Sequence, residues 1–139
     1  MITINLRGRE IPLVYTTFEM LTIQEEIAKP LNVAMKIILG RNPDDDTDMS
    51  RFGTPEHLQA ATKLIRILGN CGLEEAGMDA DLTDKMVMRA LKPAKLAEAV
   101  NLCMDAIGVG METEFEDKKP EGPVDVTLEE MNKKKEKDS

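Results

Sequence analysis

The single histidine and the two cysteines are the side chains of this 139-residue chain best suited to catalysis. His57 begins an expected helix, where a lone histidine is usually a surface residue, and no serine, cysteine or carboxylate is spaced to form a triad with it. Cys71 and Cys103 lack CxxC spacing and fall on apolar helix faces, so we expect buried, reduced thiols. The adjacent Glu25 and Glu26 would not converge on one substrate. We therefore expect neither an enzyme nor a cofactor.

Two acidic segments start with the spacing of a calcium-binding loop. The segment that begins at Asp44 has Met49 and Pro55 where an EF-hand needs glycine and glutamate. The segment that begins at Asp79 fails at the same two positions. We expect solvated loops and no metal site.

Composition and charge limit the classes of partner. The net charge of −8 argues against nucleic acid, because affinity for phosphates comes from lysines and arginines. The chain has no apolar run long enough to span a membrane and no secretory signal, so we expect a cytosolic protein that binds no membrane.

Methionine is unusually frequent. The chain has ten methionines against three phenylalanines, one tyrosine and no tryptophan. Methionine fills irregular gaps in a core, which is the interpretation we favour, but it also serves surfaces that adapt to a partner.

The hydrophobic pattern predicts a mainly α (α+β) fold in which an N-terminal hairpin, residues 2–15, packs on about five short helices. Ile2, Ile4 and Leu6 alternate with polar residues, and Pro12 makes the second strand an edge strand. We expect the helices at about 17–28, 31–39, 55–70, 83–91 and 93–107.

Local signals set the ends of several helices. Thr16 and Glu19 form a capping-box pair, and the helix that follows makes Phe18, Leu21 and Ile27 available to the core.

The long helix at 55–70 has the clearest start. Thr54 is its expected N-cap and Pro55 its first residue, and we expect it to end around Gly69, Gly72 or Gly77.

The stretch from Leu82 to Gly108 holds the longest run of well-phased apolar residues, and we expect the fold to be organised around it. The Lys92-Pro93 step divides it into two helices that meet at an elbow, and Gly108 suits the position just past the end of the second helix. We expect one folded domain at 1–115 and a flexible, charged tail at 116–139 with a transient helix from Thr127.

In this order of elements, the chain resembles the tail assembly chaperones of long-tailed bacteriophages and prophages. The residues that carry the likeness are Arg7-Gly8-Arg9-Glu10-Ile11-Pro12-Leu13, Tyr15-Thr16, Glu19 and the terminal Met131-Asn132-Lys133-Lys134-Lys135-Glu136-Lys137.

The resemblance implies a chaperone that binds the helical tape measure protein, keeps it soluble and helps to recruit tail tube subunits. It also implies programmed frameshifting, with Lys133, Lys134 and Lys135 encoded by the slippery site and a longer form that reaches the tail tube protein. The chaperone would act in the cytoplasm of the bacterial host and be absent from the mature virion.

Methionine-rich helix faces would suit such binding. We expect Met86, Met88, Leu91 and Met104 to contribute to the partner surface, although Leu91 and Met104 are better suited to the core. Self-association could cover the same apolar stripe. The alternative function is an acidic regulatory or inhibitory module that occupies a basic partner.

Overall fold

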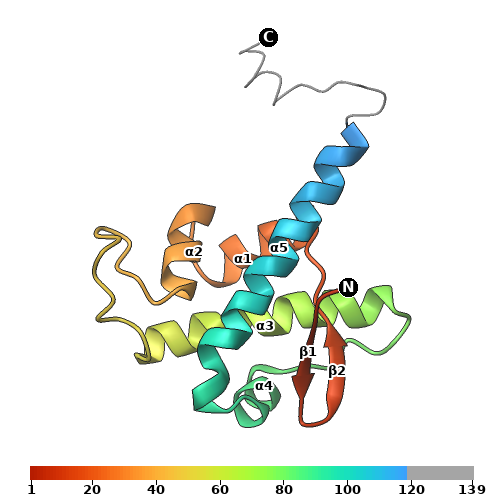
Figure 1. The fold of residues 1–139 in the computed structure, drawn as a ribbon, viewed down its shortest axis with the longest axis horizontal. Helices are drawn as coiled ribbons and strands as arrows, with labels where there is room; N and C mark the ends of the chain where they lie inside the picture. The colour runs from red at the N-terminus through yellow and green to blue at the C-terminus, as the bar shows by residue number, and fades with distance from the viewer. Residues whose placement is uncertain (119–139) are drawn as a thin grey trace. The chain divides into compact units, whose positions relative to one another are not determined.

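The computed structural model describes the backbone of residues 1–118 and the side chains of residues 1–112. A two-stranded hairpin is followed by five α-helices and one short 3-10 helix, which confirms the predicted mainly helical fold (Figure 1). The chain divides into two compact units, Met1–Ile107 and Gly108–Ser139. The elements are β1 (Thr3–Leu6), β2 (Arg9–Pro12), α1 (Thr17–Glu26), α2 (Leu31–Ile38), α3 (Pro55–Glu75), α4 (Asp84–Ala90), η1 (Pro93–Lys95) and α5 (Leu96–Lys118).

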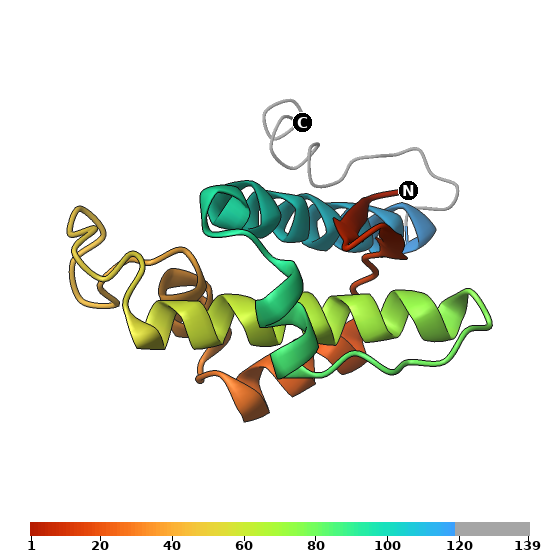
Figure 2. The same ribbon diagram turned by 90° about the horizontal axis from the view of Figure 1, so that it is seen from below.

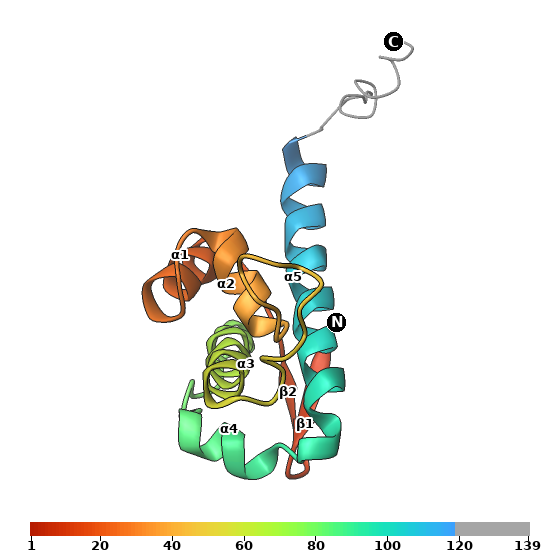
Figure 3. The same ribbon diagram turned by 90° about the vertical axis from the view of Figure 1, so that its left-hand side faces the viewer.

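Helix α3 is the centre of the first unit. It packs against α1, α2, α4 and β2. It runs through the length of this unit in Figure 2 and is seen nearly end-on in Figure 3, with α1 and α2 to one side and α4 to another. The expectation that the fold is organised around residues 82–108 is therefore wrong, because α3 supplies the surface against which α4 packs.

The hairpin exposes one face and buries the other. Ile4 pairs with Ile11 across the two strands, and these residues are buried together with Leu6. Arg7 (φ 54°) and Gly8 (φ 87°) make the tight turn in the left-handed region of the backbone. The strands are shorter than the expected 2–15 range, although Leu13 and Tyr15 beyond them are also buried.

The second strand lies against α3 at two glycines. A Cβ atom on Gly72 would lie 1.9 Å from the carbonyl oxygen of Pro12, and one on Gly69 would lie 2.7 Å from a methyl carbon of Leu82. Gly69 and Gly72 therefore do not end the helix, as two of the expected alternatives had it, but allow other chain segments to approach it. Helix α3 ends at Glu75, well beyond residue 70, and Gly77 follows with a positive φ of 78°.

Helix α1 begins as predicted but presents a different face to the core. The capping box is formed by Thr16 and Glu19. The buried residues of the helix are Glu19 and Ile23, whereas Phe18 is 69% exposed and Leu21 51% exposed. The expectation that Phe18 and Leu21 enter the core is wrong. Glu19 and Ile23 form the buried face of the helix, and Phe18 and Leu21 lie outside that face.

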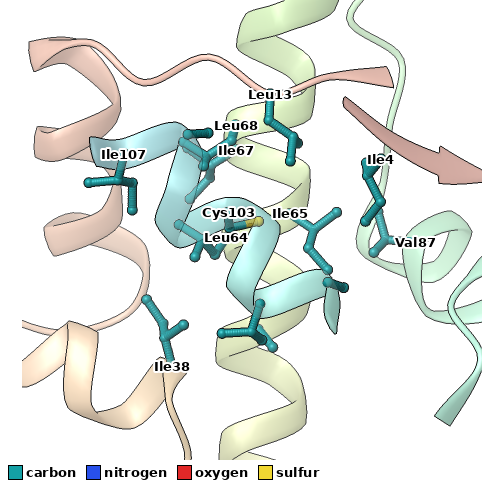
Figure 4. Close-up of a cluster of buried hydrophobic side chains, with 14 of the residues drawn as sticks. Ile4, Leu13, Ile38, Leu64, Ile65, Ile67, Leu68, Val87, Cys103 and Ile107 are labelled. Carbon is teal, nitrogen blue, oxygen red and sulfur yellow. The ribbon is translucent and has the colours of Figure 1, made fainter. Parts of the chain in front are cut away.

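The core lies between α3 and the elements around it (Figure 4). Leu64, Ile65 and Leu68 of α3 are fully buried. They are joined in one cluster by side chains of every other α-helix and of the hairpin, among them Ile4, Ile23, Ile38, Val87 and Cys103.

Helix α5 is longer than expected. Leu91 leaves α4 with extended backbone and Pro93 opens η1, so the elbow forms where it was predicted. The helix then runs through Gly108 to Lys118, so the expected end at 107 is wrong. The remaining tail, with Thr127 and Lys133–Lys135, lies outside the described residues.

Candidate partner-binding grooves

The described methionines lie at or near the surface. None of them is fully buried, but three are half-buried and pack against the core, so the favoured expectation of core filling holds for these three: Met20, Met35 and Met104. It fails for the other six described methionines, which are exposed. Met86 is 41% exposed and Met88 45% exposed. The surface interpretation of the methionine content is therefore supported by the exposed methionines, and the core interpretation by the half-buried ones.

Two grooves flank helix α4 on the side of the hairpin. The larger, about 600 Å³, runs between β1, α4 and the start of α5, and its apolar lining includes Ile4, Ala99 and Leu102. The smaller, about 410 Å³, lies between the hairpin and α4, and its apolar lining includes Leu6, Ile11 and Met86. We call them the α4 grooves. They adjoin each other, because Arg7, Arg89 and Ala90 line both.

Basic residues surround the α4 grooves in an otherwise acidic protein. Arg7 and Arg89 line both, Lys85 lines the smaller and Lys92 the larger. Among the described residues, these four side chains form no ion pair. The Arg7 guanidinium donates a hydrogen bond of 3.2 Å to the Arg89 carbonyl oxygen, which ties the hairpin turn to α4.

The loop before α4 is fixed to α3 by one side chain. The Asn70 amide group donates to the Leu82 carbonyl oxygen at 3.1 Å, and its oxygen accepts from the Leu82 N–H at 3.0 Å. Val87 is the buried residue of α4 and anchors the helix in the core. Asn70 and Val87 together fix the position of α4, the helix that forms the wall between the two grooves.

Charged residues on the opposite side of α4 complete its attachment. Asp84 accepts hydrogen bonds from Arg66 Nε at 2.6 Å and from Lys63 Nζ at 3.3 Å, and Arg66 also pairs with Glu26 of α1. Burial opposes ionisation of Asp84, but the hydrogen bonds and charges of Arg66 and Lys63 outweigh it and lower the pKa of this carboxyl. These contacts of Asp84 attach α4 to α3 on the side that faces away from the grooves.

The structure brings two of the four predicted partner-binding residues to the grooves. Met86 lines the smaller groove and Leu91 the larger, whereas Met88 and Met104 line neither. Met88 is exposed on another face of the short helix, since residues two apart do not share a face. Leu91 and Met104 are half-buried and pack against the core, as their favoured assignment to the core had it.

The cations were missed by sequence reasoning. Lys85 and Arg89 stand four residues apart, the spacing of one helix face, and Lys92 follows just beyond the end of α4. That signal could have identified the basic face of α4. The contribution of Arg7 could not have been read from spacing, because it comes from a turn distant in sequence.

His57 is a buried structural residue, so its expected surface position is wrong. It is 2% exposed, and its Nδ1 accepts a hydrogen bond of 2.9 Å from the Gly53 N–H. Its ring packs edge-on against Phe52 at 4.5 Å between centroids. Burial lowers the pKa of His57, although a hydrogen bond to the Ile38 backbone opposes this shift. The neutral imidazole thus closes the loop between α2 and α3.

The burial of His57 predicts a pH dependence of stability. The unfolded chain takes up a proton near the ordinary pKa of 6.5, whereas the folded chain resists protonation to a lower pH. The free energy of unfolding should therefore fall as pH decreases from about 7 to about 5. Urea unfolding of the wild type and of His57→Gln at a series of pH values tests this. The variant should lose that part of the slope, and equal slopes would show that His57 does not cause it.

The two cysteines are free and buried, as predicted. Burial and the neighbouring Glu19 carboxylate raise the pKa of the Cys71 thiol to about 12, and burial alone raises that of Cys103 to about 12. Both thiols are therefore protonated at neutral pH, which disfavours nucleophilic chemistry.

The aspartates between α2 and α3 organise their own loop. Asp45 and Asp48 accept hydrogen bonds from the backbone N–H groups of Thr47 and Ser50, at 3.1 and 2.9 Å. Asp46 pairs with Lys36 at 3.2 Å. Among the described residues, no three histidine, cysteine or acidic side chains are grouped to hold a metal ion.

The fold and the grooves define a small α+β protein, mainly helical, with two adjoining apolar grooves surrounded by cations. Comparison with protein-family models, curated proteins and solved structures found no match to this chain. No helix in the described part is both long and apolar enough to cross a bilayer.

Proposed function

We propose that this protein is a phage tail assembly chaperone that binds the tape measure protein through the α4 grooves. The observation that carries the proposal is the apolar lining of two adjoining grooves, with the partly exposed Met86 in one of them. An amphipathic client helix can bury its apolar face in such a groove, and methionine adapts to side chains of different shape.

The resemblance to tail assembly chaperones supports this function. One of the segments that carry it, residues 7–13, includes the hairpin turn and the second strand, and Arg7, Arg9 and Ile11 line the grooves. Residues that carry the sequence resemblance therefore also line the proposed binding surface.

The wider function follows the same resemblance. The short form would keep the tape measure protein soluble in the host cytoplasm and leave before the virion matures. A frameshifted longer form would reach the tail tube protein. The frameshift has a direct check, because the codons for Lys133–Lys135 must contain a slippery heptamer.

A non-catalytic role is part of the proposal. Burial keeps the His57 imidazole neutral and engaged with the Gly53 backbone, and burial holds both thiols in their protonated form. The alternative, an acidic module that occupies a basic partner, is less well supported at the α4 grooves, because cations surround them.

Met86→Asp should abolish the protection of the tape measure protein. A carboxylate at this position places an unpaired charge against apolar client side chains, and we expect soluble client to fall by about tenfold on coexpression. The matched control is Met78→Asp, because Met78 is 50% exposed and lies outside both grooves. Both variants should retain the wild-type circular dichroism spectrum. Client solubility that is unchanged by Met86→Asp would reject the α4 grooves as the binding site.

A further inference from the structure

The charge around the α4 grooves points to the chemistry of the captured segment. We propose that the grooves select an amphipathic helix whose apolar stripe is flanked by carboxylates. This inference rests on the proposed function for the identity of the client, but the preference for acidic flanks can be measured without that client.

The lining of the two grooves combines apolar side chains with long basic ones. Leu6, Ile11 and Leu102 supply apolar surface from the hairpin and α5. A bound segment must therefore present apolar residues to the apolar lining and different residues to the basic side chains.

Four of the six basic side chains that line the α4 grooves form no ion pair among the described residues. Arg7 donates one hydrogen bond to a backbone oxygen, and within the described residues Lys85, Arg89 and Lys92 join it in forming no ion pair. By contrast, the basic residues behind α4, Lys63 and Arg66, are both paired with Asp84. Two further cations that line the grooves are already paired, Arg9 with Asp81 and Lys95 with Glu98, and Glu98 itself lines the larger groove. The four unpaired cations are thus the ones available to carboxylates of a partner.

The protein has 26 acidic residues against 18 lysines and arginines, so a cluster of unpaired cations is not a consequence of composition. Unpaired charges of one sign that line an apolar groove favour partners of the opposite sign and disfavour partners of the same sign. The selected segment therefore carries glutamate or aspartate beside its apolar stripe.

Two synthetic helical peptides of about 20 residues test the preference directly. Both carry the same leucine stripe, and the flanking positions are glutamate in one and lysine in the other. With the full chain, fluorescence anisotropy should show at least about tenfold tighter binding of the glutamate peptide. Raising the salt concentration from about 50 mM to about 500 mM should remove most of this difference.

Arg89→Glu is the decisive variant, because Arg89 is exposed and lines both grooves. It should reduce the preference for the glutamate peptide by about tenfold or more. The matched control is Arg41→Glu, which makes the same charge change at an exposed position outside both grooves and should leave the preference unchanged.

The outcomes separate this inference from the proposed function. Equal binding of the two peptides, tighter binding of the lysine peptide, or a preference that survives Arg89→Glu would overturn the inference. Light scattering that shows an oligomer dissociated by Arg89→Glu would also overturn it, because a second copy would then occupy the grooves. Discrimination between the peptides together with client solubility that is unchanged by Met86→Asp would support the inference and reject the proposed function alone.

Discussion

Gly72→Ala should lower the free energy of unfolding by about 3 kcal/mol. The added methyl carbon would lie 1.9 Å from the Pro12 carbonyl oxygen and 2.9 Å from the Pro12 Cβ. Neither atom belongs to a flexible side-chain end, so the hairpin itself must move away from α3. Alanine inside a helix is more favourable than glycine by about 1 kcal/mol. This gain in helix propensity is too small to offset the lost packing.

Thermal unfolding followed by circular dichroism measures this effect. We expect the melting temperature to fall by about 10 °C. Gly108→Ala is the matched control, since Gly108 lies inside α5 and a Cβ there meets no atom within 4 Å. That variant should be neutral or more stable by up to about 1 kcal/mol. A Gly72→Ala protein as stable as the wild type would contradict the close packing of β2 on α3.

Asn70→Ala should cost about 2 kcal/mol of stability. The substitution removes both hydrogen bonds to the Leu82 backbone and leaves that N–H and carbonyl without these partners in a part-buried position. Because the same contact fixes the loop before α4, the variant should also loosen the wall between the α4 grooves.

Urea unfolding measures the loss, and hydrogen exchange locates it. Amide exchange in the variant should accelerate most in α4 and the loop before it. Gln24→Ala is the control, because the side chain of Gln24 donates a hydrogen bond of 3.3 Å to the Met20 carbonyl oxygen within the same helix, α1. It should change stability by less than about 0.5 kcal/mol. Equal losses in the two variants would show that the Asn70 contact has no special role.

Local signals in the sequence predicted the starts of elements well. Thr54 caps α3 and Pro55 is its first residue, as predicted from their residue types. The predicted capping box of Thr16 and Glu19 is also present. These features depend on hydrogen bonds within one turn of helix, so neighbouring residues suffice to specify them.

The glycines show where local signals fail. Gly69 and Gly72 have the residue type of a helix end but lie inside α3, because distant segments need the space that a side chain would take. Gly108 likewise lies within α5. Whether a glycine ends a helix or admits a neighbour depends on tertiary packing, which spacing alone does not contain.

The candidate site was predicted only in part. The elbow of two helices that carries Met86 and Leu91 was predicted. In the structure these two residues line grooves that the hairpin completes. The role of Arg7 in these grooves depends on a hairpin turn that is distant in sequence, since Arg7 is 82 residues from Arg89, with which it forms a hydrogen bond. Surfaces formed by segments so far apart are not encoded in a local pattern.

The central claim is that the α4 grooves contact the tape measure protein, and site-specific photo-crosslinking tests it most directly. A photoreactive side chain is placed at position 86 or, for comparison, at position 78, in cells that coexpress the tape measure protein. Both positions are exposed, and position 86 alone of the two lines a groove. We predict a crosslinked product with the tape measure protein from position 86 and little from position 78. Crosslinking from position 78 with none from position 86 would contradict the account.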